Sequence, residues 1–386
     1  MDTLCVAYLS SYPPRRCGIA TFTQNLIYAI NEKMPHRRIV IALNDVQGAY
    51  RYGQEVEFQI LSDDPSTYRS VAQEVKRSGV QLVNVQHDWG LYGGREKGYL
   101  SEFFNRIELP VVTTMHGVIH PSDRYFSERL LSITQRIAEA SRYVVVLTRS
   151  AMSILTEVYG VEPGKIEVIP HGVPVVEYQP ALRRQMKARL GLSGRKVLST
   201  FGLINTYKGI EHGIQALPMI VEKVPNVLYL VLGQTHPGLL RVQGESYRER
   251  LSKLAEQLGV DAYVHFENRY LPPGELLEYL LATDVYLVPY TVPYQAVSGT
   301  LAYALGLGRA VVSTPFLFAK EVLSGGCGVL VDFRDPEGIA RAVVGLLSDQ
   351  ERLFELERKA YEATRAWVWP EVGRRYSQLF LNILGR

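Results

Sequence analysis

The chain alternates short apolar segments with amphipathic ones along its whole length, and this alternation constrains its fold more than any other feature. Apolar runs of four to six residues separated by helical patterns are typical of strands buried on both faces of a parallel sheet. One series begins at LCVAYLSSY and includes VQLVNVQH, PVVTTMHG and YVVVLT. A second begins at RKVLSTFG and includes NVLYLVLG, YVHFEN and VYLVPY. The sequence therefore predicts an α/β protein with two doubly wound, Rossmann-like sheets.

The length of 386 residues also favours two domains over a single core. We expect an N-terminal domain over residues 1–175 and a C-terminal domain over 190–365. The segment Pro174–Arg195 is rich in proline and basic residues and is the best linker candidate. Periodicity leaves open whether a final helix over about 366–386 packs back on the first domain. Two such domains leave a cleft between the carboxyl ends of their strands, where ligands of open α/β sheets bind.

Composition describes a globular protein, with 47% hydrophobic and 21% charged residues. No apolar run approaches the roughly 20 residues of a membrane span. The N-terminus places its apolar stretch before its basic residues, the wrong order for a signal peptide. Three scattered cysteines without a CxxC pair argue against a metal ribbon or a disulfide framework. A cytoplasmic location is therefore expected.

The net charge of +3 is too small to imply a nucleic-acid partner. Basic clusters occur at Arg15–Arg16, at 36–38 and between Arg183 and Arg195. We interpret these clusters as solvated faces. Peripheral contact with anionic lipid is the alternative interpretation.

In the first domain, SYPPRRCGIATFTQNL follows the first strand and places Gly18 before a helix expected to start near Thr21. Gly18 either lets the backbone approach an anion at the helix N-terminus or belongs to a plain turn capped by Thr21. The absence of a GxGxxG pattern disfavours a nicotinamide cofactor.

Further polar residues follow later strands of this domain. QHDWGLYGG contains His87 and Asp88, and MHGVIHPSDRY contains His116 and His120. Any one histidine has an ordinary structural explanation, but several in successive strand-end loops indicate a pocket suited to hydroxyl-rich ligands. The pair His116–His120 lacks an adjacent glutamate and precedes Pro121, so we expect no metal there.

In the second domain, two strand-end features suit phosphate. Lys208 lies directly before a helix, and the turn Ser298-Gly299-Thr300 offers consecutive backbone amides at the start of another. Together they predict a diphosphate site. Backbone groups that could read a nucleobase edge follow a third strand, at Asn268, Arg269, Tyr270 and Leu271.

These segments together resemble the retaining nucleotide-sugar glycosyltransferases of family 4, which have the GT-B fold. YPPRRCGIATFTQNL is similar to the family's glycine loop, and KIEVIPHGV to its I-x-N-G-V stretch. FGLINTYKG resembles G-R-L-x-x-x-K-G, and ALGLGRAVVSTPF resembles A-M-A-x-G-x-P-V-V. The resemblance covers nearly the whole chain.

The resemblance implies a nucleotide-diphosphate sugar such as GDP-mannose or UDP-glucose on the C-terminal domain and a carbohydrate acceptor on the N-terminal one. It implies retaining hexosyl transfer without a metal or a further cofactor. Lys208 would hold the diphosphate, His116 would contact the donor sugar, and Gly202 would belong to the donor site. The acceptor side would include Arg16, Gly18, His87, Asp88 and His120. The oligomeric state stays open.

The sequence departs from the family pattern at three positions. The family's two glutamates, eight positions apart, are replaced by Gln295 and Tyr303, and the arginine of G-R-L is Leu203. A carboxylate–hydroxyl bond is worth about 1.5–3 kcal/mol, so losing two would weaken an ordinary donor by about two to four orders of magnitude. Three functions therefore remain open: a transferase that grips its nucleotide differently, a retaining disaccharide phosphorylase that uses a sugar 1-phosphate, or a non-catalytic protein that binds sugar or a partner.

Overall fold

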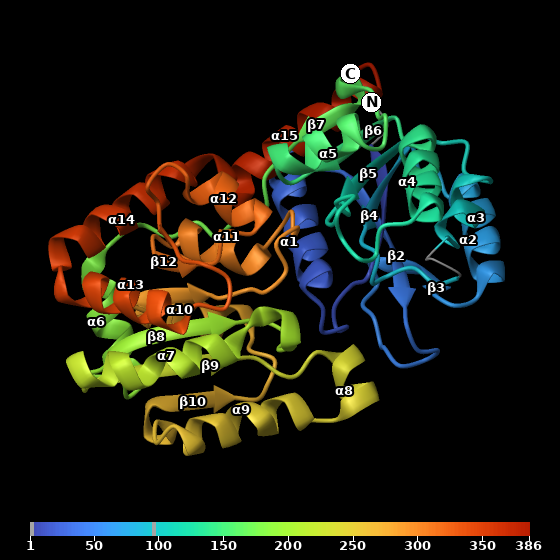
Figure 1. Cartoon of the computed structure of the whole chain (residues 1–386). Coiled ribbons are helices and arrows are strands. Elements are labelled where there is room, and N and C mark those ends of the chain that lie inside the picture. Colours follow the sequence, from blue (N-terminus) through green and yellow to red (C-terminus); the bar gives the residue numbers. More distant parts are fainter. Residues whose placement is uncertain (1–3, 95–97) are drawn as a thin grey trace. The chain divides into compact units, whose positions relative to one another are not determined.

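The protein is described by a computed structural model that covers residues 4–94 and 98–386. Two compact units divide the chain, the first formed by Met1–Gly172 with Trp367–Arg386 and the second by Val173–Ala366. Each unit is an α/β layer structure in which helices cover both faces of one sheet (Figure 1). The prediction of two doubly wound parallel sheets is confirmed.

The first unit contains a seven-stranded parallel sheet of order β3-β2-β1-β4-β5-β6-β7. Its strands are β1 (Cys5–Ser10), β2 (Arg37–Asn44), β3 (Val56–Leu61), β4 (Leu82–His87), β5 (Val111–Met115), β6 (Tyr143–Val146) and β7 (Ile166–Val168). Its helices are α1 (Gly18–Lys33), α2 (Pro65–Arg77), α3 (Leu100–Phe104), α4 (Glu128–Ala140), α5 (Arg149–Glu157) and α15 (Trp369–Ile383).

The C-terminal helix α15 packs against α1 within the first unit. A Cβ atom at Gly373 would lie 2.3 Å from the carbonyl oxygen of Ala29, so the close approach of the two helices requires a residue without a side chain there. The hydroxyl of Tyr376 bonds to Thr114 Oγ1 on β5 over 2.9 Å. Residues from the far end of the chain therefore complete the core of the first unit.

The second unit contains a six-stranded parallel sheet of order β10-β9-β8-β11-β12-β13. Its strands are β8 (Lys196–Phe201), β9 (Val227–Leu232), β10 (Val264–Glu267), β11 (Val285–Val288), β12 (Ala310–Ser313) and β13 (Val329–Leu330). Its helices are α6 (Pro180–Arg189), α7 (Ile210–Lys223), α8 (Pro237–Gln243), α9 (Ser246–Gln257), α10 (Pro273–Ala282), α11 (Gly299–Gly306), α12 (Leu317–Leu323), α13 (Pro336–Ser348) and α14 (Gln350–Ala363). The last strand, β13, contains only two residues of the apolar run GVLVDF.

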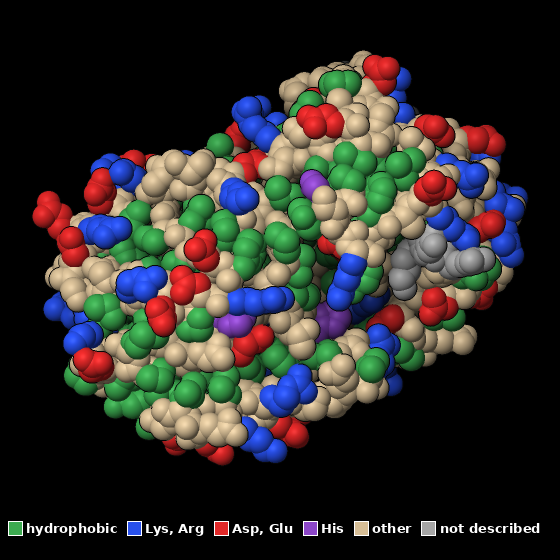
Figure 2. Space-filling model, in the orientation of Figure 1, with side chains coloured by type: hydrophobic (Ala, Val, Ile, Leu, Met, Phe, Trp, Pro, Cys, Tyr) green, Lys and Arg blue, Asp and Glu red, His purple; other side chains and the backbone are tan. Residues whose placement is uncertain are grey.

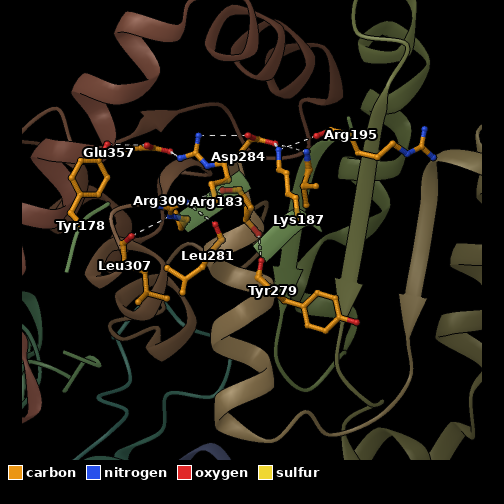
Figure 3. A network of polar contacts seen from close by, with 12 residues as sticks. Tyr178, Arg183, Lys187, Arg195, Tyr279, Leu281, Asp284, Leu307, Arg309 and Glu357 are labelled. Carbon is orange, nitrogen blue, oxygen red and sulfur yellow. Dashed lines mark hydrogen bonds and ion pairs between the residues drawn. The ribbon is translucent and has the colours of Figure 1, made fainter. Parts of the chain in front are cut away.

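The segment predicted to be a linker is partly helical. Helix α6 lies within it and packs against α10. Arg183 of this helix is buried, and its guanidinium pairs with Asp284 Oδ1 at 3.6 Å and with Glu357 (Figure 3). Lys187 Nζ lies 2.5 Å from Asp284 Oδ2. The interpretation of this basic cluster as a solvated face is therefore wrong, because two of its cations form a buried ion-pair network with acids distant in sequence.

Elsewhere on the surface, charges of both signs are interspersed on the face drawn in Figure 2. In the cluster at 36–38, His36 is also buried, with its ring nitrogen 2.7 Å from the Tyr8 hydroxyl. None of the helices in the described ranges combines the length and the apolar character that crossing a membrane requires.

Candidate donor and acceptor sites

The predicted phosphate-binding features of the second unit lie at the point where the strand order of its sheet reverses. From β8 the chain moves outward to β9 and β10, then returns to pair β11 with β8 on the opposite side. The loops after β8 and β11 therefore leave their strands side by side at one sheet edge, the usual ligand position in such sheets. Thr291 N donates to Tyr207 O over 2.9 Å and ties the two loops together.

Two glycines allow this close approach. Gly209 has a φ of +61°, and a Cβ there would lie 2.0 Å from the carbonyl oxygen of Pro289. Gly202 has a φ of +118°, and its Cβ would lie 3.2 Å from both Lys208 Nζ and Thr300 Cγ2. Side chains are strained at such φ values. Gly202 thus leaves open the space where Lys208 and Thr300 converge, and its assignment to the donor site stays a prediction.

Lys208 is a buried cation, with only 4% of its surface exposed. Its ammonium donates to the Tyr290 hydroxyl over 3.0 Å and to the Phe201 carbonyl over 3.3 Å. Burial opposes its charge, but Tyr290 and Tyr207 outweigh that effect and place the pKa of Lys208 above its ordinary value. Across residues 4–94 and 98–386, no carboxylate lies within ion-pair distance of this ammonium.

Helix α11 starts at the predicted turn. The Ser298 side chain caps it by accepting the Leu301 N–H over 3.3 Å, and the Thr300 hydroxyl lies 3.2 Å from Ser298 Oγ. Within the described chain, no group accepts the backbone N–H of Gly299 or Thr300. Free amides at a helix start, together with the positive end of its dipole, bind anions. The structure thus brings Lys208, Gly202 and the α11 turn together, as expected.

Gln295 and Tyr303, which depart from the family pattern, lie near the α11 turn in the sequence but make other contacts. The Gln295 side-chain amide donates to Val297 O over 2.8 Å within its own turn. The half-buried Tyr303 places its ring centroid 6.4 Å from that of Phe201 at the end of β8. Neither side chain supplies a charge.

The segment Asn268–Leu271 follows β10 at the same sheet edge. The Arg269 guanidinium is engaged with Glu267 and Glu275, and Leu271 is buried. Asn268 is exposed and its amide donates to Glu245 Oε1 over 3.3 Å. These contacts are compatible with the expected reading of a nucleobase by backbone groups, which stays a prediction.

The first unit has an equivalent reversal point between β1 and β4. His87 ends β4 and is 1% exposed, yet neither of its ring nitrogens has a hydrogen-bond partner among the described residues. Its ring stacks on Tyr92 at 5.5 Å and meets Trp89 edge-on at 5.0 Å. The Trp89 indole nitrogen is also buried without a partner. Unmet donors and acceptors beside aromatic rings suit a hydroxyl-rich ligand.

The neighbouring strand contributes His116, whose Nε2 lies 2.8 Å from Gln86 Oε1. Burial, reinforced by His171 and His87, lowers the pKa of His116 to about 3, and burial lowers the pKa of His87 to about 4. Both imidazoles are therefore neutral near pH 7. Burial raises the pKa of Asp88, whose carboxylate accepts the Gly90 N–H over 2.8 Å.

The glycine loop differs in detail from the prediction. Helix α1 begins at Gly18, not near Thr21, so the proposed Thr21 cap is wrong; the N-cap is Cys17, without a side-chain bond. A Cβ at Gly18 would meet nothing within 4 Å, so this backbone is open to approach. Arg16 is exposed, whereas the neighbouring Arg15 donates to Leu43 O over 2.8 Å.

His120 and His116 make separate contacts, since His120 Nδ1 accepts the Ser122 N–H over 3.1 Å. In the part of the chain that the structure describes, no group of three or more histidine, cysteine, aspartate or glutamate side chains is arranged to hold a metal ion.

Comparison with known proteins agrees with both halves of this geometry. Residues 183–367 match the family described as glycosyl transferases group 1, and residues 18–177 match glycosyltransferase family 4. The chain belongs to this glycosyltransferase family. The prediction that the chain is a glycosyltransferase is confirmed.

Two relatives illustrate the distance within the family. A D-inositol 3-phosphate glycosyltransferase of Corynebacterium efficiens is 26% identical over 80% of this chain and 73% of its own length. One of Segniliparus rotundus is 27% identical over 69% of this chain and 59% of its own. The chain thus spans about three fifths to three quarters of these relatives.

Solved structures show the same fold. A sucrose-phosphate synthase of Thermosynechococcus elongatus superposes with a TM-score of 0.79 at 16% identity, covering 99% of each chain. The Anabaena protein HepE in complex with UDP gives 0.77 at 16% identity, covering 98% of this chain and all of the other. The GT-B fold is confirmed, while identities this low carry no information on substrate.

Sequence reasoning missed Tyr290, which contacts Lys208 directly. Its only signal is a position just after an apolar strand, which a buried core tyrosine shares. It also missed Glu245, which lies 23 positions from Asn268 in the chain and meets it only in the folded structure.

Proposed function

We propose that the chain is a retaining hexosyltransferase that moves a sugar from a nucleotide-diphosphate donor to a sugar or glycan acceptor without a metal. One observation carries the proposal: a buried ammonium with no described carboxylate partner converges with two free backbone amides at a helix start. A buried cation is costly unless something pairs with it. The leaving diphosphate would supply that pairing.

In the proposed reaction the bond between the sugar C1 and the diphosphate oxygen breaks, and an acceptor hydroxyl oxygen bonds to C1 on the same face. The hydroxyl proton passes to the departing phosphate. Negative charge grows on the diphosphate as its bond to C1 breaks, so fixed donors aimed there lower the barrier. Lys208 and the Gly299 and Thr300 amides are those donors, and no side chain has to attack the sugar.

The acceptor would be bound by the first unit. His87, His116 and Trp89 offer neutral hydrogen-bonding groups, which recognise hydroxyls without demanding charge. The relatives are named for D-inositol 3-phosphate, so a phosphorylated polyol joins sugars and glycans among the acceptors to be tested. The contact of His116 with the donor sugar, the cytoplasmic location and any lipid contact through basic residues stay predictions.

The phosphorylase remains the second candidate because of Gln295 and Tyr303. A sugar 1-phosphate needs the phosphate turn but no carboxylate to chelate a ribose. Neither position supplies one here.

Titration calorimetry of the whole chain with UDP, GDP, ADP and inorganic phosphate separates the candidates. The transferase predicts tight binding of one nucleoside diphosphate and weak binding of phosphate. Saturation by phosphate with no preference for any nucleotide would favour the phosphorylase. No binding by any of the four would contradict both and leave a non-catalytic protein.

A further inference from the structure

Tyr290 lies between the two halves of the proposed diphosphate site. Its hydroxyl is 3.0 Å from Lys208 Nζ on one side, and 2.8 Å from Thr300 Oγ1 and 3.5 Å from Ser298 Oγ on the other. Lys208 follows β8 and the turn follows β11. A single phenol therefore joins the cation to the cap of α11.

The position of this hydroxyl is determined by packing. Tyr290 is 2% exposed, and its ring stacks on Phe316 with centroids 5.1 Å apart. Tyr207 meets the ring edge-on at 6.1 Å, and Thr314 Oγ1 donates to the Tyr290 carbonyl over 2.6 Å. Both ring and backbone are held, so the hydroxyl stays where it is when a ligand arrives.

The hydrogen bonds of Lys208 show how the Tyr290 phenol orients the ammonium. Lys208 has three N–H donors and no acceptor capacity, and two of the donors point at Tyr290 and Phe201. The phenol oxygen therefore accepts from Lys208, and its own proton is directed to Thr300 or Ser298. The third ammonium N–H has no acceptor in the described chain. Two bonds thus orient the ammonium and leave one donor for an anion.

We propose that Tyr290 is a positioning residue that holds the Lys208 ammonium and the α11 turn as one anion-binding unit. This inference rests on the proposed function, since it assumes that the leaving diphosphate binds there. Without the phenol, the ammonium loses its best partner and the two halves of the site are no longer linked. The effect is expected mainly in kcat, where charge on the leaving group is largest.

The variant Tyr290→Phe removes only the hydroxyl. Loss of a hydrogen bond to a charged group predicts a fall in kcat of about 10- to 100-fold, with a smaller change in KM. Tyr229→Phe is the matched control. Tyr229 is a fully buried tyrosine on β9 whose hydroxyl bonds to Thr200 Oγ1 over 2.8 Å and makes no hydrogen bond to Lys208 among the described residues. Its variant is expected to keep kcat within about two-fold.

A double-mutant cycle separates positioning from packing. If Tyr290 acts through Lys208, Tyr290→Phe has little further effect on kcat in a Lys208→Ala background, because the group it positions is gone. Equal fold-losses in both backgrounds would overturn the inference. If Lys208→Ala itself is fully active, the proposed function fails first; if it is inactive and Tyr290→Phe is normal, only the present inference fails.

If Tyr290→Phe folds poorly, a variant that changes the pKa of the Tyr290 hydroxyl without removing it tests the same inference. Burial raises the pKa of Tyr290, but Lys208, Ser298 and Thr300 outweigh it and bring this pKa below its ordinary value. The titratable groups facing it are Lys208 and Tyr207 from the β8 loop and Tyr286 from β11.

Above that pKa, the phenolate neutralises the ammonium, so kcat/KM falls at alkaline pH. Site-specific 3-fluorotyrosine at position 290 keeps the contacts but acidifies the phenol, and should move this fall to lower pH. An unmoved alkaline limb would contradict the inference.

Discussion

Near the two edges of the second unit's sheet, Arg183 and Lys208 are buried with different kinds of partner. At the amino ends of the strands, Arg183 and Lys187 pair with Asp284, and Arg183 also pairs with Glu357 (Figure 3). At the carboxyl ends, Lys208 is as deeply buried, but the hydrogen-bond partners of its ammonium among the described residues are the Tyr290 phenol and the Phe201 carbonyl.

The difference separates structure from function. Breaking a buried ion pair leaves a charge without its partner and destabilises the fold, whereas we propose that the buried Lys208 charge, which has no described carboxylate partner, is held for a ligand. The amino-end network joins α6, the start of β11 and α14, so it ties the beginning of the unit to its last helices. The carboxyl-end site joins two loops and leaves donors free.

The largest effect is expected from breaking the amino-end network. Glu357 is fully buried between Arg183 and the Tyr178 hydroxyl, which donates to it over 3.1 Å. Glu357→Ala removes one of the two carboxylates that pair with the buried Arg183 guanidinium and should lower the free energy of unfolding by about 3–5 kcal/mol. Denaturant unfolding measures this. Glu362→Ala, at an exposed ion pair on the same helix, should change the free energy of unfolding by less than about 0.5 kcal/mol. Equal effects of the two variants would contradict the special role of the buried network.

The second prediction concerns removal of the buried Lys208 cation at the carboxyl ends of the strands. Lys208→Ala should lower kcat by about 10²- to 10³-fold, the usual effect of deleting one transition-state donor. Its free energy of unfolding should stay within about 1 kcal/mol of wild type, because no carboxylate loses a partner. Lys223→Ala, at an exposed lysine of α7, is the activity control. Near-normal turnover by Lys208→Ala would show that this cation does not serve the leaving group.

The first unit extends the comparison, because its candidate site buries neutral groups. The pKa of His87 is about 4, below the ordinary value of 6.5. The unfolded chain therefore binds a proton between pH 6.5 and 4 that the folded chain does not.

Stability is full above that window and falls as the pH drops through it, by about 1.4 kcal/mol per pKa unit for each such histidine. Unfolding at several pH values should show a shallower slope in His87→Phe than in wild type. The exposed His265→Phe should leave the slope unchanged. A His87→Phe slope equal to wild type would mean that this imidazole is not what destabilises the acidified protein.

The smallest effect is expected on nucleotide-sugar affinity, when a carboxylate is restored at position 303. If ribose lies beside Tyr303, Tyr303→Glu should tighten nucleotide-sugar binding by about 10- to 100-fold through a carboxylate–hydroxyl bond. Tyr303→Gln controls for the loss of the ring. Calorimetry that finds the same affinity in all three proteins would place the ribose elsewhere.

Most of the fold could be predicted because buried parallel strands are continuous apolar runs, and both sheets have them. The sequence also placed Lys208, Gly202 and the α11 turn at strand ends, where the structure has them; their role in donor binding stays a prediction. The position of Gly18 was predicted, but its helix starts three residues earlier than Thr21 suggested, because Cys17 can occupy an N-cap without a side-chain bond.

What escaped prediction depends on partners distant in the chain. In the sequence, Arg183 looks like a surface cation beside other basic residues, and only folding brings Glu357 next to it. Tyr290 reads as a core aromatic, and only the pairing of β8 with β11 brings Lys208 to its hydroxyl. The direction of a side chain after a strand is not encoded in local spacing.

If the Lys208 charge is held for a diphosphate, a nucleotide should stabilise the protein against unfolding only when that charge is present. Wild type and Lys208→Ala would be unfolded with and without UDP or GDP, whichever binds, at about 100 times the wild-type Kd. We expect the free energy of unfolding to rise by about 2.7 kcal/mol for wild type and to change little for the variant, with similar stability of the two proteins without ligand. Equal stabilisation of both proteins by the nucleotide would contradict this expectation.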